Sequence, residues 1–268
     1  MAQLSQAKRI VVKVGTSTIT HDNGTPNIRG LDHLCRVLSD LVSTGMQVVL
    51  VTSGAVGIGV GKMGLSERPS DIAGRQAMAA LGQCELMFLY DKLFGEYGRR
   101  CAQVLLTGDI VNYEQRKTHF INCINALLEL SIIPIINEND AVAVEELEGV
   151  NIGDNDNLSA IVSLLIKADS LVMLTDIDGL YDRDPNSSGA VRIPVVLEIT
   201  DSIKAVAGGR GSKRGTGGMA TKVAAAERAC EAGIDTYIIS GSRPEALYDL
   251  IEGQSIGTHF IPKRQKSL

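Results

Sequence analysis

Two short polar stretches combine residue types that bind charged small molecules. The first, Asn137 to Asp140, directly follows the apolar run Ile132 to Ile136, and the second, Gly153 to Ala160, leads into the apolar run Leu158 to Ile166. The first run has the character of a buried strand and the second that of a buried helix. Polar groups crowded at strand ends and helix starts bind charged ligands in α/β proteins. Helix capping by Asp or Asn accounts for one or two of these residues, so the others predict a ligand site.

Two lysines occupy positions where an ammonium group would meet phosphate. Lys13 lies near the end of the apolar run Ile10 to Val14 and is followed at once by Gly15, and Lys222 ends the glycine-rich stretch 215–222. Burying an unpaired ammonium is costly, although Lys13 could extend out of a strand end and Lys222 could lie on a solvated helix face. Glycine lets backbone N–H groups close on a phosphate, and a following helix N-terminus adds a favourable dipole. We therefore predict that both lysines bind phosphate groups.

A second glycine-rich stretch only approximates two familiar nucleotide-binding motifs. Gly59 to Gly64 fits G-x-G-x-x-G, but it neither directly follows a predicted strand nor has the acidic partner that dinucleotide binding requires. A Walker A loop would need glycine at Val56 and serine or threonine at Met63. We therefore expect neither a dinucleotide site nor a P-loop here.

Strand-like and helix-like runs alternate along the chain and would position these groups. The expected strands are Ile10–Val14, Val48–Thr52, Val104–Leu106, Ile132–Ile136, Leu171–Leu174 and Thr236–Ile239, and the expected helices are Leu31–Val42, Ala73–Leu93, His119–Leu128, Leu158–Lys167 and Thr221–Ala232. This alternation predicts a mostly parallel sheet covered on both faces. Residues 139–151 and 181–196 are expected to be loops or hairpins. No repeat or linker divides the chain, so a single domain over residues 1–268 is expected, with a ligand crevice at the carboxyl ends of its strands.

Composition excludes several classes of protein. A net charge of −5 provides no basic surface for nucleic acid or an anionic membrane. No apolar run approaches the roughly 20 residues of a membrane span, and the polar N-terminus is unlike a secretory signal. The 5 cysteines are widely spaced without a C-x-x-C pair, which predicts buried, reduced thiols and a cytoplasmic protein.

At these residues the sequence resembles the amino acid kinase family, and most closely its branch that phosphorylates glutamate. The matching blocks follow the family order from Lys8 to about Phe260, which is more specific than any single glycine motif. The blocks are residues 12–17, 51–55, 136–142, 153–160, 174–176 and 216–222.

The resemblance implies an αβα sandwich that transfers the γ-phosphoryl group of ATP, with Mg²⁺, to the γ-carboxylate of L-glutamate. The product would be γ-glutamyl phosphate, formed in the first step of proline biosynthesis. The resemblance implies that Lys13, Asp156 and Lys222 are catalytic, with Asp156 holding the two lysines. The glutamate-binding residues that it implies are Ser53, Gly54, Asp140 and Asn155. The nucleotide-binding residues that it implies are Lys13, Gly15, Thr175, Asp176, Thr216, Gly217, Gly218, Met219, Ala220, Thr221 and Lys222. The magnesium ligands are not identified.

The resemblance also implies further partners: L-proline as a feedback inhibitor, a glutamyl phosphate reductase that consumes the product, and a second copy of the chain in a homo-oligomer. Because the segment Gly64 to Arg75 is polar and lies close to the Ser53 block, we expect it to respond to an effector. Many bacterial members carry an additional C-terminal PUA domain, which the sequence up to Leu268 does not contain. The kinase chemistry is expected without it, since every kinase block is present.

Two other functions stay open at this point. A kinase for a different acid, such as N-acetylglutamate, aspartate or carbamate, would use the same blocks, because the shape of the acid pocket cannot be read from the sequence. A catalytically inactive amino-acid sensor on the same scaffold is the second alternative. The presence of Lys13, Asp156 and Lys222 favours an enzyme over a sensor.

Overall fold

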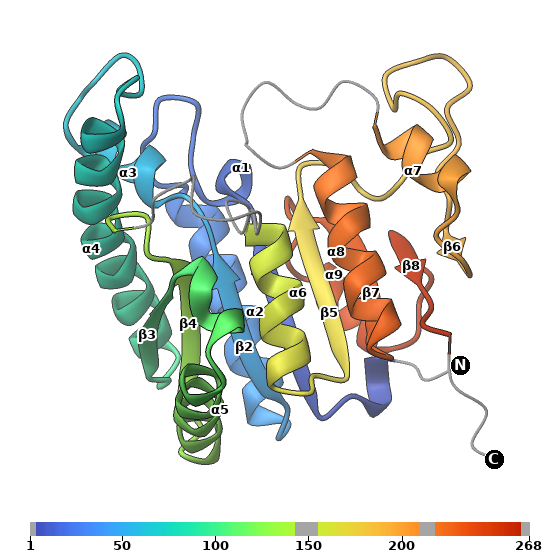
Figure 1. Cartoon of the computed structure of the whole chain (residues 1–268), viewed down its shortest axis with the longest axis horizontal. Coiled ribbons are helices and arrows are strands. Elements are labelled where there is room, and N and C mark those ends of the chain that lie inside the picture. The colour runs from blue at the N-terminus through green and yellow to red at the C-terminus, as the bar shows by residue number, and fades with distance from the viewer. Residues whose placement is uncertain (1–3, 143–154, 209–217, 264–268) are drawn as a thin grey trace.

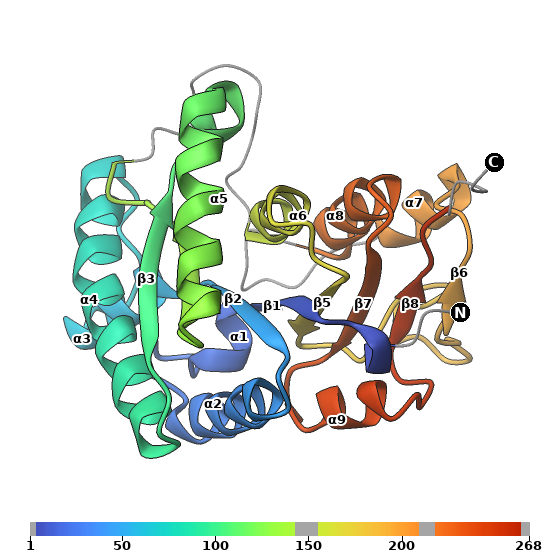
Figure 2. The same ribbon diagram turned by 90° about the horizontal axis from the view of Figure 1, so that it is seen from below.

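The computed structural model describes residues 4–142, 155–208 and 218–263, and its strands form one sheet in the order β3-β4-β2-β1-β5-β7-β8-β6. Helices cover both faces of this sheet, as Figures 1 and 2 show. The strands are β1 Arg9–Val14, β2 Gln47–Thr52, β3 Cys101–Leu106, β4 Ile133–Glu138, β5 Ser170–Thr175, β6 Val195–Val196, β7 Asp235–Ser240 and β8 Thr258–Phe260. The α-helices are α1 Thr16–Ile19, α2 Ile28–Ser43, α3 Ala55–Lys62, α4 Ile72–Glu96, α5 Glu114–Glu129, α6 Asn155–Leu165, α7 Asp201–Ala207, α8 Met219–Glu231 and α9 Ala246–Ile251, and the 3₁₀ helices are η1 Leu4–Gln6 and η2 Gly108–Asn112.

The pairing confirms the predicted αβα sandwich with a mostly parallel sheet. Neighbouring strands from β3 across to β7 all run parallel, and β8 pairs antiparallel with β7 and parallel with β6. The carboxyl ends of parallel strands meet at one edge of a sheet. In Figure 1 that edge is the upper one, where the segments that follow β2, β4 and β5 lie.

The alternation of side chains along the central strand decides which helices each residue meets. Val11 packs into the apolar cluster formed with α5, α6 and α8, whereas Ile10, Val12 and Val14 pack into the opposite cluster with α2, α4 and α9. Side chains two positions apart on a strand share a face. Lys13 therefore points toward α6 and α8, on the same face as Val11.

Glycines let α3 and α4 pack in direct backbone contact, and they explain the motif that the sequence only approximated. A Cβ atom added at Gly82 would lie 1.8 Å from the carbonyl oxygen of Ala55, and one at Gly59 would lie 2.0 Å from that of Met78. The stretch around Gly59 is therefore a helix whose glycines serve packing. Gly59 and Gly61 thus lie within α3 and not in a loop.

The structure extends and corrects the expected elements. Each expected strand and helix is found with shifted ends, but α1, α3, α7, α9, β6 and β8 were not expected. Of the expected loop 139–151, only residues 139–142 lie within the described part, where they form a turn, while 181–196 contains an antiparallel bridge between Tyr181 and Arg192 and ends in β6. The prediction of buried thiols is wrong for Cys84 and Cys123, which are exposed, although all 5 cysteines are free.

None of the helices that the structure describes combines the length and the apolar character needed to span a lipid bilayer.

The backbone contact between α3 and α4 predicts that a larger residue at Gly82 destabilises the protein. Gly82→Ala forces a Cβ atom into the backbone of α3, so we expect the protein to lose at least about 1–3 kcal/mol of unfolding free energy. Gly95→Ala, in the same helix, is the matched control, because a Cβ atom there has nothing within 4 Å. This control should leave stability unchanged or raise it by up to about 1 kcal/mol. Chemical denaturation measures both, and equal stability of the two variants would contradict the packing described here.

Candidate active site

A buried carboxylate between two buried lysines lies at the centre of the site. Asp156 Oδ1 is 2.5 Å from Lys13 Nζ, and Asp156 Oδ2 accepts a hydrogen bond of 3.0 Å from Lys222 Nζ. The exposed fractions are 0% for Asp156, 4% for Lys13 and 6% for Lys222. Two ammonium groups and one carboxylate leave one formal positive charge in this cluster, so an anion such as a phosphate group is the complementary ligand.

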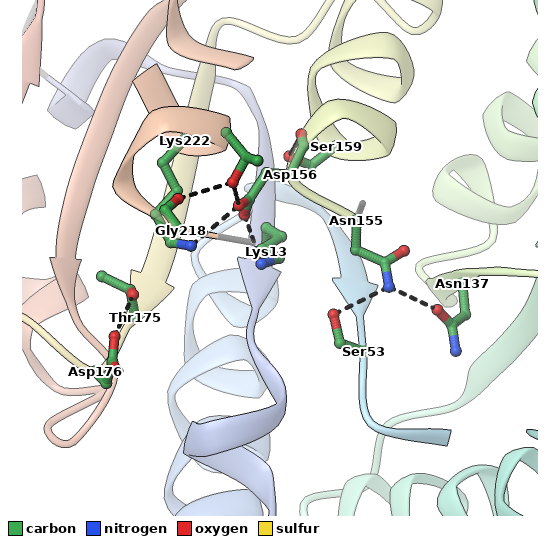
Figure 3. A network of polar contacts seen from close by, with 11 residues as sticks. Lys13, Ser53, Asn137, Asn155, Asp156, Ser159, Thr175, Asp176, Gly218 and Lys222 are labelled. Atoms are coloured by element: carbon green, nitrogen blue, oxygen red, sulfur yellow. Dashed lines mark hydrogen bonds and ion pairs between the residues drawn. The ribbon is translucent and has the colours of Figure 1, made fainter. Parts of the chain in front are cut away.

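Three elements bring these charges together. Lys13 comes from β1, Asp156 from the first turn of α6, and Lys222 from the first turn of α8 (Figure 3). Within α6, Ser159 Oγ donates to the backbone carbonyl of Asp156 at 2.6 Å, which ties the first turn together. Thr221 Oγ1 lies 2.8 Å from both Asp156 Oδ2 and the carbonyl oxygen of Gly218, so its single proton serves one of these acceptors at a time.

The two lysines determine the ionisation of Asp156. Burial alone would raise the pKa of this carboxyl group, but the charges of Lys13 and Lys222 and the hydrogen bonds from Lys13 and Thr221 outweigh burial. The pKa of Asp156 is therefore lowered from its ordinary value, and the carboxylate stays ionised.

A series of side-chain hydrogen bonds lies beside the charged cluster. Asn155 Nδ2 donates to Ser53 Oγ at 3.0 Å and to Asn137 Oδ1 at 3.2 Å, and Asn137 Nδ2 donates to Gln83 Oε1 at 2.9 Å. Ser53 follows β2, Asn137 belongs to β4, Asn155 opens α6 and Gln83 lies on α4. The series therefore joins the carboxyl ends of two strands to helices on both faces of the sheet.

Another polar group follows β5, on the other side of the lysines in the view of Figure 3. Thr175 Oγ1 donates to Asp176 Oδ1 at 2.9 Å, and the Thr175 carbonyl accepts from the Gly241 backbone at 2.7 Å. Gly15 lies close to the lysine head group, since a Cβ atom there would be 3.9 Å from Lys13 Nζ and 3.8 Å from the Leu174 carbonyl oxygen. Gly15 thus leaves the approach to Lys13 free of a side chain.

The remaining predicted residues are placed as follows. Gly54 adopts a left-handed conformation (φ 97°) directly before α3, where a Cβ atom would lie 2.9 Å from Ile19 Cδ1. Asp140 lies in the turn after β4. Gly218 precedes α8, and Met219 and Ala220 are in its first turn with Thr221. Thr216 and Gly217 lie outside the described residues.

The sequence predictions did not include two members of the hydrogen-bonded series. Asn137 lies in the first polar stretch but was not among the predicted site residues. Gln83 lies in a predicted helix with no polar motif around it. Gln83 is one of several polar residues in that helix, and such a residue is more often exposed than buried, so the sequence did not distinguish it.

Within the described residues, no group of three or more His, Cys, Asp or Glu side chains is placed to hold a metal ion. A divalent cation that accompanies a nucleotide usually keeps several waters and binds phosphate oxygens with one or two carboxylates. The described residues therefore do not form an all-protein cage.

The lowered pKa of Asp156 makes stability depend on pH. The unfolded-state pKa is about 3.9, so the stabilisation by Asp156 is fully present above that value and is lost as pH falls through the lower folded-state pKa. Asp156→Asn leaves two buried ammonium groups without their carboxylate and should cost about 3–5 kcal/mol at neutral pH. We expect this difference in unfolding free energy to narrow below about pH 4. Denaturant titrations of both proteins at several pH values measure it, and a difference that does not change with pH would refute the assignment.

Comparison with known sequences matches nearly the whole chain to one family. Residues 8–240 match the model of the amino acid kinase family. The glutamate 5-kinase of Clostridium perfringens (strain 13 / Type A) is 51% identical over 263 residues, which are 97% of this chain and 98% of that protein. The glutamate 5-kinase of Listeria monocytogenes serovar 1/2a is 48% identical over 265 residues, which are 98% of this chain and 96% of that protein.

Solved structures share the fold at lower identity. Isopentenyl phosphate kinase of T. acidophilum, in a product complex, superposes with a TM-score of 0.65 at 20% identity, covering 94% of this chain and 99% of that one. UMP kinase from Bacillus anthracis also gives a TM-score of 0.65, at 15% identity, covering 96% and 97%. The extent of the family match and the identity to the curated relatives, together with this common sandwich, show that the chain belongs to the amino acid kinase family.

Proposed function

We propose that the protein transfers the γ-phosphoryl group of ATP to the γ-carboxylate of L-glutamate. The observation that carries this proposal is the buried cluster of Lys13, Asp156 and Lys222 beside the hydrogen-bonded series that contains Ser53 and Asn155. One part of this arrangement is complementary to phosphate and the other to a small polar acid. The relatives named glutamate 5-kinase support this assignment of the two parts.

The acid would bind at Ser53, Gly54, Asp140 and Asn155. Within the described residues, Asn155 Oδ1 is buried and has no hydrogen-bond partner. A buried acceptor without a partner is costly, and an ammonium group supplies the missing donor. The α-ammonium of glutamate is such a donor, and the Asp140 carboxylate is a second group of the right charge. The hydroxyl of Ser53 and backbone N–H groups near Gly54 are suited to the α-carboxylate.

The nucleotide would bind at the edge formed by Thr175, Asp176 and the first turn of α8. The N-terminus of α8 has no side-chain cap on Gly218, so its backbone N–H groups can meet phosphate oxygens. The nucleotide would also contact Gly15, Met219, Ala220 and Thr221, and Thr216 and Gly217, which lie outside the described residues.

The reaction needs no general base, because an ionised carboxylate is already a nucleophile. The glutamate oxygen forms a bond to the γ-phosphorus while the bond to the bridging oxygen of ADP breaks. Positioning and charge neutralisation dominate such transfers. Lys13 and Lys222 offset the charge on the transferring phosphoryl group, and Asp156 holds both ammonium groups in place. Mg²⁺, when bound, would neutralise further charge on the phosphates.

The remaining expectations follow from this reaction and stay predictions. L-proline would inhibit the enzyme, with the segment Gly64 to Arg75 as the responding loop. A glutamyl phosphate reductase would consume the labile acyl phosphate, and the chain would form a homo-oligomer in the cytoplasm. One sheet that contains all the described strands supports a single kinase domain over residues 1–268.

Trapping of the product tests the proposed function. Hydroxylamine converts an acyl phosphate to a hydroxamate, so we expect hydroxamate from protein, Mg-ATP and L-glutamate, and little from N-acetylglutamate or aspartate. Product from another acid instead would keep the chemistry but contradict the proposed substrate. Folded protein that gave no product with any of these acids would favour the inactive sensor.

The charge-neutralisation role predicts a loss of turnover. Lys222→Ala removes one of two ammonium groups that face the phosphates, so we expect kcat to fall by about 10²–10³-fold. Lys204→Ala is the matched control, because Lys204 is an exposed lysine whose ion pair with Glu227 lies on the surface. Its kcat should stay within about twofold of the wild-type value. Steady-state hydroxamate kinetics give both numbers, and near-normal kcat in Lys222→Ala would disprove the role.

A further inference from the structure

The three side-chain amides of Gln83, Asn137 and Asn155 have orientations fixed by a single backbone group. The N–H of Glu138 donates to the side chain of Asn137 at 2.9 Å, and a backbone N–H can only donate. The atom that accepts must therefore be Asn137 Oδ1, which places Nδ2 at the other end of that amide.

The orientation then propagates to both neighbours. Asn137 Nδ2 needs an acceptor, so Gln83 must present Oε1 to it, as the 2.9 Å contact shows. Asn137 Oδ1 needs a second donor, so Asn155 must present Nδ2 to it. What remains within the described residues is a buried acceptor without a partner, Asn155 Oδ1, on a residue of the proposed acid site. The polarity of that end thus depends on the amide of Asn137, whose other end is held by Gln83.

Gln83 anchors this series from the far side of the sheet. It lies on α4, which packs into the apolar cluster opposite to that of α6, and it is only 9% exposed. Its Nε2 atom is also buried and has no hydrogen-bond partner in the described part of the chain. If Gln83 only filled space, an apolar side chain of similar volume would fill it without the free-energy cost of burying an amide. Its contact with Asn137 therefore points to a role in holding that amide.

The same helix face carries a second polar anchor seven residues later. The hydroxyls of Tyr90 and Thr52 are 2.8 Å apart, and Thr52 is the last residue of β2, directly before Ser53. Helix α4 thus bonds to the carboxyl ends of both strands that carry the acid side of the site. Asp156, in contrast, is bonded to Lys13, Lys222 and Thr221.

We propose that Gln83 is a positioning residue that holds Asn137, and through it Asn155, in the orientation that binds the acid substrate. This inference rests on the proposed function and names a residue through which the acid site is set. We expect Gln83 to act mainly on acid binding, because it bonds to Asn137, whereas the two lysines bond to Asp156.

The test separates acid binding from nucleotide binding. Gln83→Met keeps the volume of the side chain but cannot accept from Asn137, and Gln83→Ala leaves room for a water molecule. We expect either variant to raise the KM for L-glutamate by about tenfold, with the KM for ATP within about twofold of wild type. Cys84→Ala is the matched control, because Cys84 is the next residue on α4 and is exposed. It should change neither constant.

A double-mutant cycle distinguishes positioning from general loss of structure. If Gln83 acts through Asn155, Gln83→Met should change the glutamate KM little when Asn155 is already alanine, since the two effects are not additive. Equal effects of Gln83→Met in both backgrounds, or equal rises of the two KM values, would overturn the proposal. So would failure of both Gln83 variants to unfold cooperatively, because Gln83 would then be a folding residue.

The same experiment keeps the two proposals apart. If the wild-type protein phosphorylates a different acid, the Gln83 variants are measured with that acid. Only the proposal that L-glutamate is the substrate is then wrong. Should wild-type turnover of glutamate be normal while the Gln83 variants match it, the proposed function stands and the positioning role fails. Should no acid react at all, both proposals fall together.

Discussion

The attraction between one buried carboxylate and two buried ammonium groups is the constraint on which the site depends. Asp156 has no exposed surface, and its charge is balanced only because β1 and α8 deliver a lysine to each of its oxygens. Removal of Asp156 leaves two buried ammonium groups without compensation, which costs far more than the intact cluster contributes to stability. A buried ion cluster contributes little to the stability of a core. We therefore infer that this one, at the carboxyl edge of the sheet, serves ligand binding.

Strand geometry and one backbone hydrogen bond position the side chains around this cluster. Val11 and Lys13 share a face of β1, so the alternation that packs Val11 against α6 and α8 also directs the lysine toward their first turns. Adjacent to it, a backbone N–H on Glu138 fixes the polarity of three amides in succession. The backbone therefore determines where the charged side chains meet and how the three amides are oriented.

The sequence predicted the elements well because parallel strands are apolar runs and amphipathic helices are periodic, and both patterns are local. It also predicted Lys13, Asp156 and Lys222 as partners, since the family resemblance supplied the pairing that local patterns lack. The bond between Gln83 and Asn137 joins residues 54 positions apart, and no local pattern encodes it. Helix α3 was missed because its glycines, which serve contact with α4, resemble a loop. The exposure of Cys84 was misjudged because α4 carries apolar residues on nearly all sides, so its buried face cannot be read from spacing.

Asn155 and Asp156 are consecutive residues of one helical turn, and neighbouring helical positions point about 100° apart. Asn155 belongs to the amide series and Asp156 to the lysine cluster, so a single insertion or deletion in the first turn of α6 would rotate both out of place together. The start of α6 is thus closed to gradual evolutionary change in length. Divergence of this scaffold toward acids of other shapes has to keep that turn intact and proceed through residues outside it, such as Ser53 after β2.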